Sequence, residues 1–165
     1  MSVAHRPTRG TWLLSSKEMD AVKAALMKGL RIDRTYDVPY VAGYNKQNTV
    51  VYIDHQMPKG FSYKGRTILT DPYLVMHERI EDSLEAGPPP LPYLFAHQIA
   101  LRSERDAVVG DGISWTVYNN FMMHWIKVIG SRASYPNCPR DLDLEPYRGD
   151  RATLRKMRFS NATGD

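Results

Sequence analysis

The chain has 165 residues, of which 42% are hydrophobic and 24% charged, and it carries a net charge of +4. These values are ordinary for a globular protein and correspond to about one domain, which at this length buries about two-thirds of its unfolded surface. The single cysteine, Cys138, excludes an intrachain disulfide framework, and no run approaches the roughly 20 apolar residues of a membrane span. With a polar N-terminus that lacks a signal-peptide core, the sequence predicts a cytoplasmic protein.

The N-terminal part predicts a flexible arm followed by one helix. Residues 1–11 are polar and include proline and glycine, a composition typical of a loose arm. Ser15 and Glu18 have the spacing of a helix capping box, and Gly29 is placed to end the helix. Nothing on this helix indicates chemistry, so we expect it to be a packing element.

β-branched and aromatic residues predict a small antiparallel sheet in the next part of the chain. Three segments are predicted as strands, namely 40–42, 49–55 and 66–69, with a hairpin loop between the first two. Asp54 and His55 come at the end of the second strand, where a scaffold often presents functional groups to a loop. We therefore include both as neighbours of a functional site.

The following two predicted helices carry the residues on which a functional prediction depends. Asp71 and Pro72 are suited to the start of the first helix, and the proline-rich stretch 87–92 separates it from the second. The second helix is expected to end near Gly110 or Gly112. Successive residues of a helix lie about 100° apart around its axis. On this geometry the apolar face of each helix also includes ionisable residues. These residues are His77, Glu81, His97 and Glu104.

Four ionisable groups on two inward faces indicate that these groups meet one another. Burying a carboxylate is costly unless a cation, a metal or several hydrogen bonds compensate it. Two imidazoles with two carboxylates suit a divalent metal, with zinc as the first choice and iron as the second. Glu78 projects about 100° away from His77, at the rim of the cluster. A general base for a metal-bound water would stand there.

The segment His77-Glu78-x-x-Glu81 resembles the His-Glu-x-x-His signature of zincin metallopeptidases. The resemblance covers roughly residues 36–109, since strands precede the active-site helix in that family as well. It implies that His77 is a metal ligand, that Glu78 is the general base, and that a further ligand comes from a following helix. Glu81 stands where the family has its second histidine, and a carboxylate can also bind zinc. Face geometry alone gives the candidates for the remaining ligands, which are His97 and Glu104.

A structural interpretation of the same residues stays open. His77 can hydrogen-bond Glu104 and His97 can hydrogen-bond Glu81, which would make a buried polar network that fixes the helix pair without metal. The function would then reside in a protein-binding surface. A third interpretation, an iron site like those of helical di-iron proteins, has less support because the sequence contains no Glu-x-x-His spacing.

The C-terminal part predicts a covering helix and then an irregular tail. Apolar and aromatic residues recur every three or four positions from Trp115 to Ile129, as in a helix that packs over the pair. Prolines and alternating charges predict irregular, partly ordered structure over 131–165. Basic residues near the end can attract nucleic acid, but no nucleic-acid-binding motif accompanies them, so we do not expect that partner.

Together these features predict a single α+β domain over residues 1–165, in which a small antiparallel sheet packs with three to four helices. The first functional prediction is a zincin-like, metal-dependent hydrolase that cleaves a peptide or amide bond with a metal-activated water. The alternative is a non-enzymatic helical domain that acts through protein–protein interaction. The predicted site consists of Glu78 as catalytic base, His77, Glu81, His97 and Glu104 as candidate metal ligands, and Asp54 and His55 as neighbours.

Overall fold

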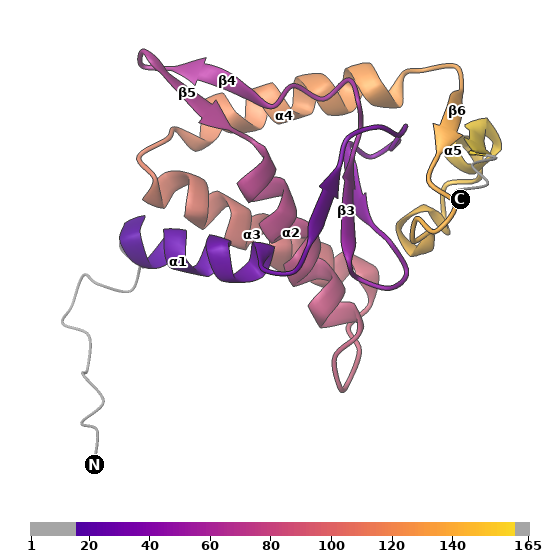
Figure 1. The fold of residues 1–165 in the computed structure, drawn as a ribbon, viewed down its shortest axis with the longest axis horizontal. Coiled ribbons are helices and arrows are strands. Elements are labelled where there is room, and N and C mark those ends of the chain that lie inside the picture. The colour runs from indigo at the N-terminus through magenta and orange to yellow at the C-terminus, as the bar shows by residue number, and fades with distance from the viewer. Residues whose placement is uncertain (1–15, 161–165) are drawn as a thin grey trace.

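Five α-helices and three small sheets make up residues 16–160, the part of the chain that this computed structural model describes (Figure 1). The helices are α1 (Ser16–Met27), α2 (Asp71–Glu85), α3 (Tyr93–Gly110), α4 (Trp115–Gly130) and α5 (Arg151–Lys156), with a 3₁₀ turn η1 (Glu145–Tyr147). The strands are β1 (Arg31–Asp33), β2 (Ala42–Tyr44), β3 (Val50–Ile53), β4 (Gly60–Tyr63), β5 (Arg66–Leu69), β6 (Tyr135–Cys138) and β7 (Met157–Phe159). The predicted α+β class is confirmed, and the predicted arm 1–11 lies outside the described residues.

The largest sheet has three strands in the order β1-β3-β2. Its central strand, β3, is a run of β-branched and aromatic residues that is buried along its whole length. β2 pairs with it in antiparallel register, Gly43 opposite Tyr52, as the sequence predicts. β1 pairs with the other side of β3 in parallel, Ile32 opposite Val51. The sequence pattern does not predict β1, because a strand of three residues shows too little alternation to be recognised.

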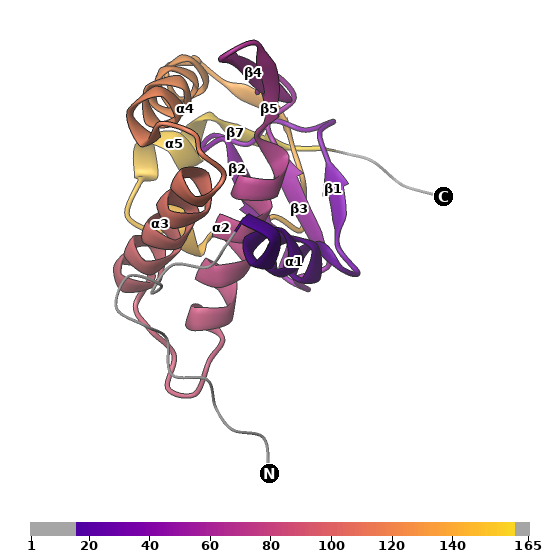
Figure 2. The ribbon, with the colours of Figure 1, turned by 90° about the vertical axis from the view of Figure 1, so that its left-hand side faces the viewer.

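The helix α2 lies between this sheet and α3 (Figure 2). It is covered on both sides, so its consecutive residues from Tyr73 to Glu78 are all buried. Thr70 takes the N-cap position, and Asp71 and Pro72 form the first turn, one position later than a capping aspartate would stand. Arg34 donates a hydrogen bond from Nε to the Asp71 carboxylate over 3.2 Å, which fixes this end of α2. The helix that carries His77, Glu78 and Glu81 is therefore buried in the centre of the molecule and anchored at its N-terminal end.

Residues 131–160 contain ordered elements where the sequence predicts an irregular tail. β6 and β7 pair in parallel, and η1 and α5 lie between them along the chain. Pro136 lies within β6, and Pro146 lies in the first turn of η1, where its missing N–H costs no hydrogen bond. Elements of three to six residues interrupted by prolines show no periodicity in sequence, which is why the pattern does not predict them.

Residues 141–147, which we call the strap, begin along the outer edge of β2 and continue into the 3₁₀ turn η1. The Lys46 amide donates to the Asp141 carbonyl over 2.9 Å, and the Asp143 amide donates to the Tyr44 carbonyl over 2.9 Å. Between these two hydrogen bonds Leu142 is completely buried. The strap therefore acts as a short additional strand that covers this edge of the sheet.

The side chain of Asp141 anchors the strap. Its carboxylate accepts hydrogen bonds from Tyr52 Oη over 2.7 Å and from Asn45 Nδ2 over 3.1 Å. Burial opposes ionisation, but these hydrogen bonds outweigh it and hold the pKa of Asp141 below its usual value. We expect Asp141→Ala to lower the free energy of unfolding by about 2 kcal/mol in urea titrations, because two donors lose a charged acceptor.

The matched control for this prediction is Asp106→Ala, which removes an exposed carboxylate from α3. It is expected to change the free energy of unfolding by less than about 0.5 kcal/mol, as surface substitutions usually do. Equal stability of the two variants would show that Asp141 does not anchor the strap.

Candidate metal centre

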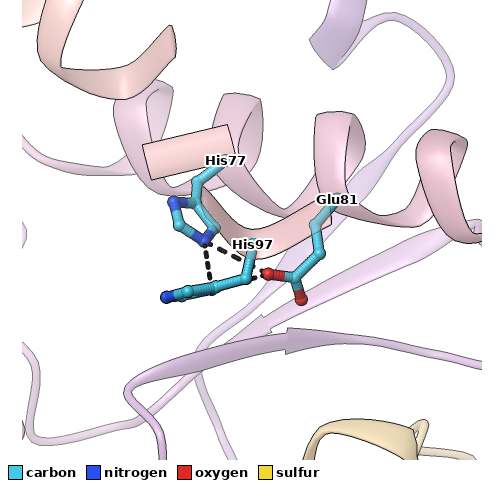
Figure 3. A group of neighbouring side chains, drawn as sticks. All are labelled: His77, Glu81 and His97. Atoms are coloured by element: carbon cyan, nitrogen blue, oxygen red, sulfur yellow. Dashed lines mark hydrogen bonds and ion pairs between the residues drawn. The ribbon is translucent and has the colours of Figure 1, made fainter. Parts of the chain in front are cut away.

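The helices α2 and α3 bring three of the predicted site residues into one group. His77 and Glu81 lie one turn apart on the same face of α2, and His97 lies opposite them near the start of α3 (Figure 3). His77 Nε2 lies 3.2 Å from His97 Nδ1 and 3.4 Å from Glu81 Oε2. The third distance, between His97 Nδ1 and Glu81 Oε2, is 2.7 Å. Three ligand atoms from two helices thus point at one another.

The triangle formed by these three atoms has the size that a metal ion requires. Ligand atoms at about 2.0–2.2 Å from a zinc ion lie roughly 2.8–3.6 Å apart for bond angles between 90° and tetrahedral. Two of the observed distances, 3.2 and 3.4 Å, fall within this range. The third, 2.7 Å, belongs to a direct hydrogen bond between His97 and Glu81 that a bound ion would replace. The residues present therefore fit one divalent ion with only small side-chain movements.

Glu104 occupies the other side of the His77 ring. Its Oε2 lies 2.9 Å from His77 Nδ1, and its Oε1 accepts a hydrogen bond from Tyr118 Oη over 2.5 Å. A metal-binding histidine commonly gives its second N–H to a carboxylate, which fixes the ring and leaves the other nitrogen for the metal. The geometry therefore places Glu104 as the orienting partner of His77. Of the two carboxylates that the sequence leaves open as ligands, it favours Glu81.

Hydrogen bonds between histidine and carboxylate side chains hold the group together. Burial alone would lower the pKa of His77, but its hydrogen bonds with Glu104 and Glu81 outweigh burial and raise that pKa to about 10. Burial would raise the pKa of Glu81, but its hydrogen bonds with His77 and His97 lower it overall. Without metal, His77 therefore keeps a proton beside an ionised carboxylate. A bound divalent ion would take the place of that positive charge.

Glu78, the predicted general base, lies in the wall of a cavity of about 220 Å³ that the three candidate ligands also line. Only 9% of the residue is exposed, and within residues 16–160 no group forms a hydrogen bond with its carboxyl group. Burial raises the pKa of Glu78 to about 8, against the opposing effect of the charge on His77. A buried carboxyl group with a raised pKa and no hydrogen bond, facing a cavity, is typical of a functional group.

The remaining walls of this cavity differ in character. The side formed by α3 and α4 is apolar and aromatic, and it includes Leu101, Trp115, Tyr118, Met122, Met123 and Ile126. The opposite side comes from β2 and the strap, and it includes Tyr44, Asp143, Pro146 and Tyr147. Sequence reasoning does not find these residues, since the spacing of the α4 residues indicates only an ordinary core face and the strap has no regular pattern.

Asp54 and His55, the predicted neighbours, do not line the cavity. Asp54 is fully buried, and its carboxylate accepts hydrogen bonds from Arg132 Nη1 over 3.1 Å and from the Val38 amide over 2.8 Å. His55 is exposed, and its Nδ1 lies 3.3 Å from Asp37 Oδ1. Asp37, Asp54 and His55 form a second group of close ligand atoms. Arg132, however, pairs with both aspartates. The Arg132 guanidinium already provides the positive charge that a metal ion would bring. This cluster therefore fixes the loop after α4 to the sheet.

Comparisons of the chain with protein-family models, with curated proteins and with solved structures found no match. Between residues 16 and 160, no helix combines the length and the apolar composition that crossing a membrane requires. A fold alone does not define a function, so the function has to be inferred from the site itself.

Proposed function

We propose that this chain is a metal-dependent hydrolase that resembles zincins and cleaves a peptide or amide bond with an activated water. His77, Glu81 and His97 would hold a zinc ion, and Glu78 would act as the general base. One observation carries this proposal: a triangle of ligand atoms the size of one ion shares a cavity with a buried carboxyl group that has no hydrogen bond within residues 16–160.

The chemistry follows from the position of each side chain. Held by His77, Glu81 and His97, zinc would supply a water whose pKa is lowered to about 7. Glu78 directly follows the ligand His77 and faces the same cavity, so its carboxylate can accept a proton beside the ligand group. The same carboxyl group can then donate that proton to the nitrogen of the leaving amine. Glu104, held in turn by Tyr118, keeps the His77 ring in orientation.

A second candidate function has support from the same contacts. A purely structural network requires hydrogen bonds between His77 and Glu104 and between His97 and Glu81, and both are present. In that case the domain would act through a protein-binding surface. The network makes no use of Glu78, however, whose carboxyl group lines the cavity and has no hydrogen bond within residues 16–160. We therefore favour the hydrolase, in which Glu78 has a role.

Metal analysis of the 165-residue chain tests the proposal. Protein purified without added metal and then incubated with zinc is expected to hold about one zinc ion per chain after dialysis, because the three ligand atoms can enclose one ion. Amide hydrolysis should disappear on chelation and return when zinc is added. Failure to bind zinc or iron(II), the second ion that suits two histidines and a carboxylate, would leave the structural network as the function of these residues.

A further inference from the structure

The sheet edge beside the cavity is already occupied by the strap. The Tyr44 carbonyl accepts a hydrogen bond from the Asp143 amide, and the Lys46 amide donates to Asp141, so these groups of the edge are not free for a substrate. Extended peptides often bind by adding a strand to an open sheet edge. Here the strap continues through Pro146 into the cavity wall, so a long peptide would have to displace it.

The opposite wall of the cavity is an apolar surface that continues to the outside. Met122, Met123 and Ile126 on α4 all line the cavity. Met122 is buried, whereas Met123 and Ile126 are 54% and 39% exposed, which extends the apolar surface from the interior to the mouth. Methionine side chains are flexible and adapt to apolar groups of different shape. An apolar group of a ligand would gain free energy by covering this surface.

The size and charge of the cavity define what fits between these two walls. Its volume of about 220 Å³ exceeds that of engineered apolar cavities of about 150 Å³ that bind benzene, so it has room for an aromatic ring. Three of its carboxyl groups, Glu78, Glu81 and Glu104, belong to the two helices that carry the candidate ligands, and a fourth, Asp143, belongs to the strap. Among residues 16–160 no lysine or arginine lines the cavity, so an acidic group placed away from the ligand end would be desolvated without a cationic partner.

From the strap, the apolar α4 wall and the size of the cavity we infer the substrate class. The site acts on short amides that carry a bulky apolar group, and not on internal bonds of extended polypeptides. The apolar group lies against Met123 and Ile126, and the bond to be cleaved faces Glu78. This inference rests on the proposed hydrolase function, and its test separates the failure of one from the failure of the other.

The first measurement is hydrolysis by the zinc-loaded 165-residue chain, which is monitored through the release of primary amine. The substrates are the blocked dipeptides N-acetyl-Phe-Phe-NH2, N-acetyl-Ala-Ala-NH2 and N-acetyl-Glu-Glu-NH2, cleaved between their two residues, together with unfolded casein. We expect kcat/KM for the Phe-Phe substrate to exceed that for Ala-Ala by at least about tenfold, as apolar pockets discriminate by size. The Glu-Glu substrate and casein should remain uncleaved. Internal cleavage of casein, or equal rates for Phe-Phe and Ala-Ala, would overturn the inference while leaving the hydrolase function intact.

Binding provides a readout that does not depend on turnover. Calorimetry compares two zinc-binding compounds, phenylacetohydroxamic acid and acetohydroxamic acid, which differ by one aromatic ring. We expect the aromatic compound to bind the zinc-loaded chain at least about tenfold more tightly. This difference without any hydrolysis would refute the hydrolase function and retain the apolar site, whereas equal affinities would refute the apolar site.

A matched pair of variants tests whether the preference for the aromatic compound arises from α4. Ile126 and Val128 are both β-branched and similarly exposed, at 39% and 37%, but only Ile126 lines the cavity. Ile126→Ser is expected to reduce the affinity advantage of the aromatic compound by about fourfold, which corresponds to the burial of one methylene group. Val128→Ser should leave the advantage unchanged. Equal behaviour of the two variants would overturn the assignment of the apolar group to α4.

Discussion

Glu78→Gln is expected to lower kcat/KM for amide hydrolysis by roughly 10²–10⁴-fold, the usual contribution of a general acid–base group. Glutamine has the shape of glutamate but cannot accept a proton from water. The variant should still bind one zinc ion per chain, since His77, Glu81 and His97 keep their positions. Steady-state kinetics and metal analysis on the same preparation measure both quantities.

The stability of the Glu78→Gln variant shows whether loss of activity reflects loss of the fold. In the metal-free native protein the pKa of Glu78 is raised by burial to about 8, whereas an unperturbed glutamate has a value of 4.5. The native state therefore binds more protons than the unfolded chain between these values, and stability falls as pH rises through this range. Glutamine does not ionise, so at pH 8 the variant should unfold at the same temperature as the parent chain or a higher one.

Glu85→Gln is the matched control, because Glu85 lies on the same helix but outside the cavity wall. Its carboxylate accepts a hydrogen bond from Tyr44 Oη over 3.1 Å. We expect this variant to hydrolyse amides at the parental rate. If Glu78→Gln hydrolyses as fast as Glu85→Gln, Glu78 is not the general base.

The helices of the site are the part of the structure that the sequence predicts best. A helix of 15 or 18 residues repeats its pattern over several turns, so its inward face can be recognised from spacing alone. The shared face of His77 and Glu81 follows directly from their i, i+4 spacing on α2. The same reasoning places His97 and Glu104 on the inward face of α3. The contacts among these four side chains therefore have a physical basis in helical periodicity.

Other parts of the site depend on contacts that spacing along the chain does not describe. Whether Glu104 or Glu81 faces the metal position depends on which nitrogen of His77 each carboxylate reaches, and this is set by how α2 and α3 pack.

The strap pairs Leu142 with Asn45, two residues separated by most of the domain. The position of Asp54 after a strand predicts a place near the site, yet its partner Arg132 comes from the loop after α4. Long-range pairings of this kind are set by tertiary packing and not by local pattern.

His77→Ala is expected to abolish stoichiometric zinc binding, because two remaining ligands, Glu81 and His97, are too few for a stable zinc site. The substitution also removes the partner of two buried carboxylates, Glu81 and Glu104, so unfolding should become easier by about 3 kcal/mol. Zinc titration monitored by calorimetry and urea unfolding without metal measure these two effects separately. The control is His124→Ala, which removes an exposed histidine from α4.

The two candidate functions of the cluster predict different outcomes for a second variant, His97→Ala. The His97 ring is about one-third exposed, so its removal is expected to leave the fold intact. If the cluster is a metal centre, the variant loses zinc as completely as His77→Ala does, because all three ligand atoms enclose the same ion. If the cluster is only a structural network, the parent chain, His97→Ala and His124→Ala bind zinc equally weakly, and the substitutions differ only in stability. Retention of stoichiometric zinc by both His77→Ala and His97→Ala would show that the ion binds elsewhere and would refute this metal centre.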